Sequence, residues 1–200
     1  MGSTNIRSLP SQSCLHAPIQ ADDATIRAAA RQVASSVSVV TLGSGSARAG
    51  LTALSVSLLS ADPATLVLCV KRASAGYAAF ARSSRFAVNI LGGDQREIAE
   101  HFVGSADELI GGSFDVGRWL PLAEGLDCLA DCAAVFECEI EEIMERGANA
   151  IVIGRVRRAL IGGGSALVRW RGSYDQLGWS QNEILRAVGL RPRGDARDRP

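Results

Sequence analysis

Apolar residues fall in short runs separated by glycine-rich turns along most of the chain, a pattern that indicates strands with few helices. The pattern predicts strands at residues 37–42, 51–60, 65–70, 85–91, 132–144, 150–160 and 167–170. It predicts short helices at residues 22–33, 74–81, 95–103 and 181–187, with Asp22 and Asp23 capping the first. Because the strands do not alternate with long helices, we expect a mainly β fold, a β-barrel with flanking helices, rather than a doubly wound sheet.

Two of these strands have patterns that predict their surroundings. Residues 65–70 (TLVLCV) are apolar at consecutive positions, as expected of a strand buried on both faces. Residues 132–144 alternate apolar residues with glutamates, so we expect the glutamates on the solvent face of an antiparallel strand. Gly147 then turns the chain into residues 150–160. The resulting hairpin is expected to set Glu137, Glu139 and Glu141 against Arg155, Arg157 and Arg158.

Two tails are predicted to flank a single domain. Residues 1–20 are rich in serine, contain two prolines and show no hydrophobic period, so we predict a flexible arm. Residues 191–200 are charged and rich in proline and glycine, so we predict a disordered tail. The domain is therefore expected over residues 21–190, with loops at residues 43–50 and 111–120.

The composition narrows the classes of function. The 200 residues carry 21 Lys+Arg and 21 Asp+Glu, a formal net charge of zero, which argues against nucleic-acid and membrane-surface binding. Hydrophobic residues make up 47% of the chain, enough for a full core. We see neither a signal peptide nor an apolar stretch of the roughly 18 residues that a membrane span needs. We therefore expect a cytoplasmic protein.

Several kinds of site are disfavoured by motifs that the sequence lacks. No G-x-G-x-x-G follows a strand, and neither G-x-x-x-x-G-K-[ST] nor G-x-S-x-G occurs, which disfavours a Rossmann site, a P-loop and a serine hydrolase. The cysteines are irregularly spaced, with only His16 and His101 as possible co-ligands, so we expect no metal site. Buried free thiols are instead expected at Cys14, Cys69, Cys128, Cys132 and Cys138.

One stretch has a composition that suggests a ligand. A row of short hydroxyl side chains, which leaves room for a flat ring against the backbone, consists of Thr52, Ser55, Ser57 and Ser60. The next strand ends in Lys71-Arg72-Ala73-Ser74 and enters a helix. A helix N-terminus beside two cations is suited to a phosphate. These features predict a phosphorylated planar cofactor, and a serine-rich edge strand is the alternative interpretation.

Six motifs in order resemble those of the short-chain flavin reductases, over about residues 24–178. They are IRAAARQVASSVSVVTL, GLTALSVSLLSADPATLVLCVKR, RFAVNILGGDQREIAEHF, FDVGRW, IVIGRV and RWRGSYDQL. The second is similar to a family run that begins G-x-T-A-x-S, and the third to R-F-x-V-N-x-L. The last three are similar to F-x-G-x-x-W, I-x-I-G-x-V and Y-x-R-G-x-Y. The resemblance implies an FMN-binding split barrel of Greek-key type and a homodimer with the flavin near the subunit interface.

The resemblance also implies which residues form the site. The flavin ring would lie along Thr52, Leu54, Ser55, Val56 and Ser57. The phosphate or ribityl end would lie near Lys71, Arg72, Ser74, Ala75 and Gly76. Two side chains of the following helix would approach the ring, His101 and Phe102. Catalytic roles are implied for Asn149, in the nicotinamide pocket, and for Tyr174, in the closing segment.

The function that the resemblance implies is an NAD(P)H:flavin oxidoreductase. Such an enzyme uses NADH or NADPH to reduce FMN or FAD, and the reduced flavin passes transiently to a separate flavin-dependent monooxygenase. This chain has Ala148 and Asn149 where the family usually has an acid and a histidine. Two alternatives therefore stay open: a flavoprotein that acts directly on an organic substrate, and a flavin-free binding protein, isomerase or cyclase.

Overall fold

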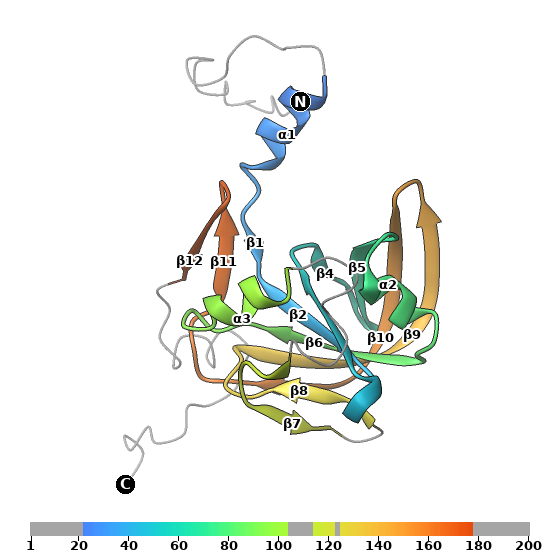
Figure 1. Cartoon of the computed structure of the whole chain (residues 1–200). Helices are drawn as coiled ribbons and strands as arrows, with labels where there is room; N and C mark the ends of the chain where they lie inside the picture. The colour runs from blue at the N-terminus through green and yellow to red at the C-terminus, as the bar shows by residue number, and fades with distance from the viewer. Residues whose placement is uncertain (1–21, 104–113, 123–124, 178–200) are drawn as a thin grey trace, which may run out of the picture.

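Strands are the main element of the computed structural model, which describes residues 22–103, 114–122 and 125–177 (Figure 1). The predicted arm at residues 1–20, helix at residues 181–187 and tail at residues 191–200 lie outside the described residues. Within the part that is described, no helix is both long and apolar enough to cross a membrane.

Seven antiparallel strands form the main sheet, in the order β3-β2-β6-β9-β10-β5-β4. Their bounds are β2 (Ser38–Leu42), β3 (Ala49–Ala53), β4 (Val56–Ala61), β5 (Ala64–Lys71), β6 (Arg85–Ile90), β9 (Ala134–Arg146) and β10 (Asn149–Ile161). The two edge strands, β3 and β4, are separated along the chain only by Leu54 and Ser55, a link that we call the corner. Because so short a link spans roughly 10 Å at most, the sheet must curl until its two edges meet, which makes it a barrel.

Two smaller sheets complete the β structure. One has the order β1-β11-β12 and the other pairs β7 with β8. Their bounds are β1 (Ser35–Ser36), β11 (Leu167–Trp170), β12 (Ser173–Gln176), β7 (Trp119–Pro121) and β8 (Asp127–Leu129). Two backbone hydrogen bonds join Leu167 of β11 to residues beside the barrel strands: Val37 N donates to Leu167 O (2.9 Å) and Leu167 N to Leu91 O (2.8 Å). Leu91 N in turn donates to Val37 O (2.9 Å).

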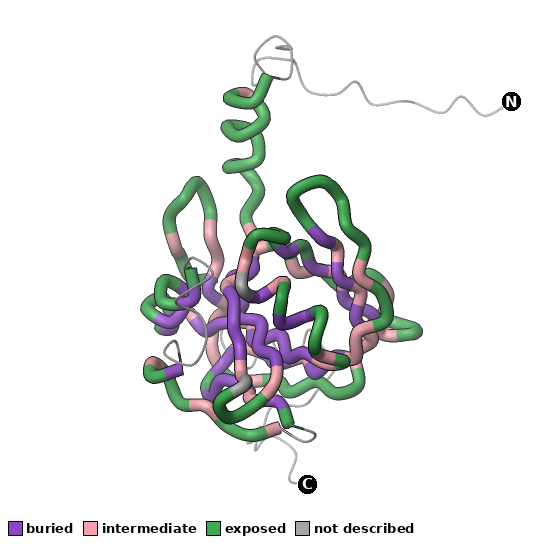
Figure 2. The backbone as a smooth tube through the Cα atoms, turned by 45° about the vertical axis from the view of Figure 1, so that its right-hand side comes forward, coloured by how far each residue is buried: buried purple, intermediate pink, exposed green. Residues whose placement is uncertain are grey.

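The helices are short and lie outside the sheets. They are α1 (Asp23–Ala30), α2 (Ala75–Phe80), α3 (Arg96–His101) and the 3₁₀ helix Gly45–Ala47. The predicted cap of α1 is confirmed, since the Asp22 carboxylate accepts a hydrogen bond of 2.7 Å from Thr25 N. No residue of α1 is buried, however, and the helix stands away from the barrel (Figure 2). Its apolar residues therefore pack against no part of the core that the structure describes.

The core lies partly inside the barrel and partly under α3. The inner cluster surrounds Phe86 and Leu68, and the cluster under α3 contains the buried Phe102 ring. A buried amide links the barrel to β8: Asn89 donates to Val39 O (2.8 Å) and accepts from Leu129 N (2.8 Å). This explains the asparagine in the segment RFAVNIL, because a buried amide is stable only when its polar atoms are paired.

The predicted strand at residues 51–60 is wrong in one respect, because the structure divides it at the corner into β3 and β4. The first half pairs with β2 and the second with β5. Hydroxyl and apolar residues are interleaved on both sides of the break, so the local pattern does not reveal it. The loop predicted at residues 43–50 is also too long, since β3 begins at Ala49.

The expectation of a strand buried on both faces at residues 65–70 is wrong for β5. Leu66, Leu68 and Val70 are buried, whereas Cys69 is exposed. The alternation arises because the barrel interior covers only one face of β5. The loop predicted at residues 111–120 is corrected as well, since its end belongs to strand β7.

The β9–β10 hairpin confirms the expected pairing of glutamates with arginines. Arg155 contacts Glu141, Arg157 contacts Glu139 and Arg158 contacts Glu137. The expectation that all three glutamates are solvated is wrong for Glu137, which is only 2% exposed. It lies between Arg85 and Arg158, and the guanidinium of Arg158 donates two hydrogen bonds of 2.8 Å to it. Two arginines thus compensate the burial of this carboxylate.

Gly154 in β10 provides a test of the barrel packing. A Cβ at this position would lie 2.6 Å from Phe86 Cε1, inside the barrel core. We expect Gly154→Ala to lower the free energy of unfolding by about 1–3 kcal/mol, because the core must shift to admit the methyl group. Urea denaturation measures the change. Gly164→Ala is the control, since a Cβ there meets nothing within 4 Å. Equal stability of the two variants would contradict this packing.

Candidate functional site

A cavity of about 340 Å³ opens at the corner, where the two edges of the barrel meet. Strands β3 and β5 each supply three residues of its lining and the corner supplies two. The others are Ser74 before α2, two residues that follow α3, the first residue of β10 and one residue of β11. The lining residues are Leu51, Thr52, Ala53, Leu54, Ser55, Cys69, Val70, Lys71, Ser74, Phe102, Val103, Asn149 and Arg169. We call this space the corner cavity.

The wall formed by β3 is held rigidly against α3. Thr52 uses both of its donors for this purpose, since its hydroxyl donates to Ala99 O (2.8 Å) and its N–H to Phe102 O (3.2 Å). A Cβ at Gly50 would lie 2.8 Å from Phe102 Cδ1, so only glycine lets the Phe102 ring pack on the strand. The glycine and threonine of the segment GLTA thus build the wall. Thr52 is a positioning residue, because its hydroxyl proton is already engaged.

Aromatic residues of the segment FDVGRW support the same wall from behind. The ring centroid of Phe102 lies 5.2 Å from that of Phe114 and 5.7 Å from that of Trp119, both in edge-to-face geometry. The Trp119 indole donates a hydrogen bond of 2.9 Å to Val116 O. The wall therefore rests on interlocked rings, which favour a single rigid arrangement.

At the other end of the corner cavity, Lys71 and Asn149 lie opposite each other in the pairing of β5 with β10. Ser74 caps α2, since its hydroxyl donates to Lys71 O (2.7 Å) and accepts from Tyr77 N (3.3 Å). The Ser74 hydroxyl is thus engaged in the cap, and Lys71 and Asn149 offer one cation and one amide at this end. A phosphate or another small anion is the ligand that such a set favours.

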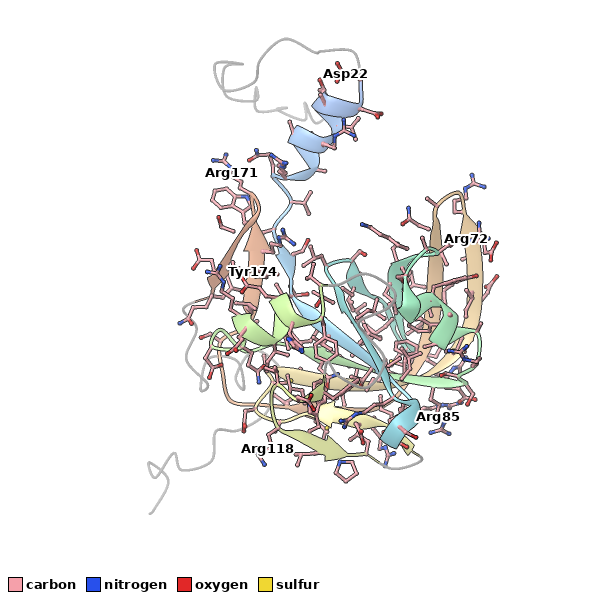
Figure 3. All side chains as sticks on the ribbon, viewed as in Figure 1. Asp22, Arg72, Arg85, Arg118, Arg171 and Tyr174 are labelled. Atoms are coloured by element: carbon pink, nitrogen blue, oxygen red, sulfur yellow. The ribbon has the colours of Figure 1, made fainter. Side chains whose placement is uncertain are left out.

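Arg72 belongs to the neighbouring hairpin and does not line the corner cavity. Its guanidinium pairs with Glu145 (2.7 Å) and donates to Gly147 O (3.1 Å), so it fastens the β9–β10 turn (Figure 3). The Tyr77 hydroxyl donates to the same Glu145 carboxylate (2.5 Å), and this hydrogen bond raises the pKa of Tyr77. Arg72 therefore shapes the site by holding the turn before Asn149.

The charged side chains that line the corner cavity are all positive. Lys71 and Arg169 line it, and none of the described lining residues is acidic. Arg169 is half-buried and lies over the Tyr174 ring, 5.4 Å from its centroid. A cavity that carries cations without acidic residues attracts an anionic ligand.

The structure brings together about half of the predicted site residues. Those that line the corner cavity are Thr52, Leu54, Ser55, Lys71, Ser74, Phe102 and Asn149. Those described residues that do not line it are Val56, Ser57, Arg72, Gly76, His101 and Tyr174, and the side chain of Ala75 lies outside the part that the structure describes. Gly76 instead permits close packing of α2 on β3, since a Cβ there would lie 3.2 Å from Leu51 Cβ. Tyr174 lines a second cavity of about 420 Å³, which shares Val103 and Arg169 with the first.

Sequence reasoning missed two polar residues of this site, Cys69 and Arg169. The signal for Cys69 is its spacing, because residues two apart on a strand share a face and Lys71 lies two positions later. Arg169 had no local signal, since β11 reaches the cavity through long-range pairing. Cys69 also corrects the expectation of buried thiols, which holds for Cys128, Cys132 and Cys138. Burial raises the pKa of both Cys132 and Cys138 to about 12.

Known proteins resemble this chain in both sequence and structure. The family model described as "Flavin reductase like domain" matches residues 30–178. The FMN reductase (NADH) RutF of Bradyrhizobium diazoefficiens is 34% identical over 122 residues, which are 60% of this chain and 66% of that protein. The reductase component of 4-hydroxyphenylacetate 3-monooxygenase of Pseudomonas aeruginosa is 30% identical over 127 residues, which are 64% of this chain and 75% of that protein.

A solved structure of a related oxidoreductase has a similar fold. The structure of the NADH:FAD oxidoreductase SgcE6 of Streptomyces globisporus matches with a TM-score of 0.73 and 27% identity, covering 82% of this chain and 99% of that one. The matched segments span 48% to 66% of the length of the first curated relatives. The family model covers well over half of this chain, and the barrel agrees with the expected split-barrel fold. The chain therefore belongs to the flavin reductase-like domain family.

Proposed function

We propose that this protein is an NAD(P)H:flavin oxidoreductase that supplies reduced FMN or FAD to a separate flavin-dependent monooxygenase. The observation that carries the proposal is the corner cavity, where six of the residues implied for flavin binding meet Asn149. Relatives named as an FMN reductase (NADH) and as the reductase component of a monooxygenase support the reaction and the kind of partner.

The residues of the corner cavity fit a flavin. A volume of about 340 Å³ lies within the usual range for small-ligand sites. The short side chains of Ala53 and Ser55 leave the corner open to a flat ring, and Lys71 would hold the phosphate at the other end. When bound, the flavin supplies the redox chemistry, as the acceptor of a hydride from the nicotinamide. The protein contributes binding, orientation and exclusion of water.

The two residues implied for catalysis, Asn149 and Tyr174, lie in different parts of the structure. Asn149 lines the corner cavity opposite Lys71, at the end assigned to the flavin phosphate, so its amide, which can both donate and accept hydrogen bonds, would help to hold the cofactor. Tyr174 lies beyond Arg169, with the guanidinium groups of Arg96 and Arg169 each 5.4 Å from its ring centroid. We therefore assign Tyr174 the role of positioning Arg169.

Four exposed apolar side chains support a homodimer. Leu58 and Leu59 on the edge strand β4 are 57% and 59% exposed, and Ile26 and Val33, in and after α1, are 55% and 66% exposed. An edge strand with exposed leucines is a surface that proteins normally cover. A second copy of this chain is the occupant that the family resemblance implies, and it would lie beside the corner cavity.

Steady-state oxidation of the reduced nicotinamide tests the reaction directly. We expect purified protein to oxidise NADH or NADPH rapidly only when free FMN or FAD is added. Consumption should continue through many equivalents of flavin, because a reductase that supplies a partner must release its product. Absorbance of the reduced nicotinamide follows the reaction. Folded protein that is inactive in all four combinations would contradict the proposal and favour a repurposed barrel.

The dimer has a separate test. Leu58→Glu is expected to convert the protein to a monomer, because a buried, unpaired carboxylate is costly at an interface. Light scattering after size-exclusion chromatography measures the mass. Leu120→Glu is the control, since Leu120 is an exposed leucine on β7, outside the proposed interface. A native protein that is already monomeric, or a dimer that survives Leu58→Glu, would contradict this interface.

A further inference from the structure

A cavity of about 590 Å³ lies between the end of α1 and the β11–β12 hairpin, and arginines dominate its lining. Four arginines line it, Arg27, Arg31, Arg169 and Arg171, and none of its described lining residues is acidic. We call it the arginine cavity. Figure 3 shows Arg171 at the tip of the hairpin, close to the end of α1.

Hydrogen bonds fix the two walls of the arginine cavity to each other. Arg171 N donates to Arg31 O (3.1 Å), and the Arg171 guanidinium donates twice to Gln32 Oε1 (2.9 and 2.8 Å). The same guanidinium stacks over the Trp170 ring, 4.5 Å from its centroid. The arginines are therefore gathered by specific contacts between two segments that are far apart in the sequence.

These arginines lack the carboxylate partners that arginines have elsewhere in the structure. Ion pairs with Asp or Glu are made by Arg48, Arg72, Arg85, Arg96, Arg118, Arg155, Arg157 and Arg158. Among the described residues, no carboxylate pairs with Arg31, Arg169 or Arg171. Arg27 has only an exposed pair with Asp23 at 3.5 Å, of the kind that contributes little. Positive charges that lie close together without carboxylates repel one another, and a bound anion removes this repulsion.

The arginine cavity adjoins the corner cavity at the end where the flavin ring is placed. The two cavities share Leu54 and Arg169, whereas Lys71 and Ser74 line only the corner cavity. A ligand that extends from the ring into the arginine cavity therefore runs away from the flavin phosphate. The reductant must bring its nicotinamide to the ring, and its phosphates would then lie among the arginines.

We propose that the arginine cavity binds the phosphates of the nicotinamide dinucleotide, and that Arg31 and Arg169 select NADPH over NADH through its 2′-phosphate. This inference rests on the proposed function. The pyrophosphate carries about two negative charges and the 2′-phosphate adds about 1.5 to 2 more, which four guanidinium groups match. Arg169 stands at the first tyrosine of the Y-x-R-G-x-Y pattern, so this cation is a feature of this chain.

Equilibrium titration with the oxidised dinucleotides tests the proposal without turnover. We expect NADP⁺ to bind about tenfold or more tightly than NAD⁺, measured by calorimetry with and without FMN. Arg31→Gln should remove most of this ratio, because it deletes a charged donor to the 2′-phosphate and keeps the backbone contact of Arg31. Arg82→Gln makes the same change of charge at an exposed arginine outside the arginine cavity, and it should leave the ratio intact.

Equal affinities of the native protein for NADP⁺ and NAD⁺ would overturn the proposal. So would an Arg31→Gln variant that loses affinity for NADP⁺ and for NAD⁺ by the same factor. The proposed function fails separately. Tighter NADP⁺ binding in a protein that never reduces flavin would contradict the reductase and leave the phosphate site standing. Flavin reduction with a preference for NADH would support the reductase and overturn the selection of NADPH.

Discussion

The link of Leu54 and Ser55 between opposite edges of one sheet is the constraint on which the rest of the structure depends. Two residues cannot reach across an open seven-stranded sheet, so the sheet curls and its edges meet. Among the described strands the ladder does not continue across this junction, because β3 pairs with β2 alone and β4 with β5 alone. The same link that closes the barrel thus leaves a gap in it, and this gap is the corner cavity.

The packing around the corner explains several motif residues that carry no chemistry of their own. Gly50 and Gly76 allow a ring and a helix to approach β3 closely, and Thr52 ties the strand to α3. Asn89 of β6 links β8 to β2 through two hydrogen bonds of its amide. These contacts make the wall rigid, and rigidity is what the protein must supply if the cofactor provides the chemistry. The motif therefore specifies the shape of the site more than its reactive groups.

Local periodicity predicted most strands and helices of the described chain, because those signals depend on near neighbours. It missed the corner, since the interleaved residues on either side of Leu54 look alike and only pairing with β2 or β5 distinguishes them. It also missed the burial of Glu137, which depends on arginines from two other strands. Arg169 reaches the site through β11, so its role could not be predicted from residues near it in sequence. Long-range pairing is the information that a local pattern lacks.

The placement of the flavin at the corner is the central claim, and FMN titration of variants tests it most directly. Ser55 lines the corner cavity, whereas Ser46 lies exposed in the 3₁₀ helix at the opposite end of the β2–β3 hairpin. Binding of FMN, followed by quenching of its fluorescence, should be lost in Ser55→Phe and retained in Ser46→Phe, because only the first fills the cavity. Equal FMN affinity in Ser55→Phe and the native protein would contradict this account.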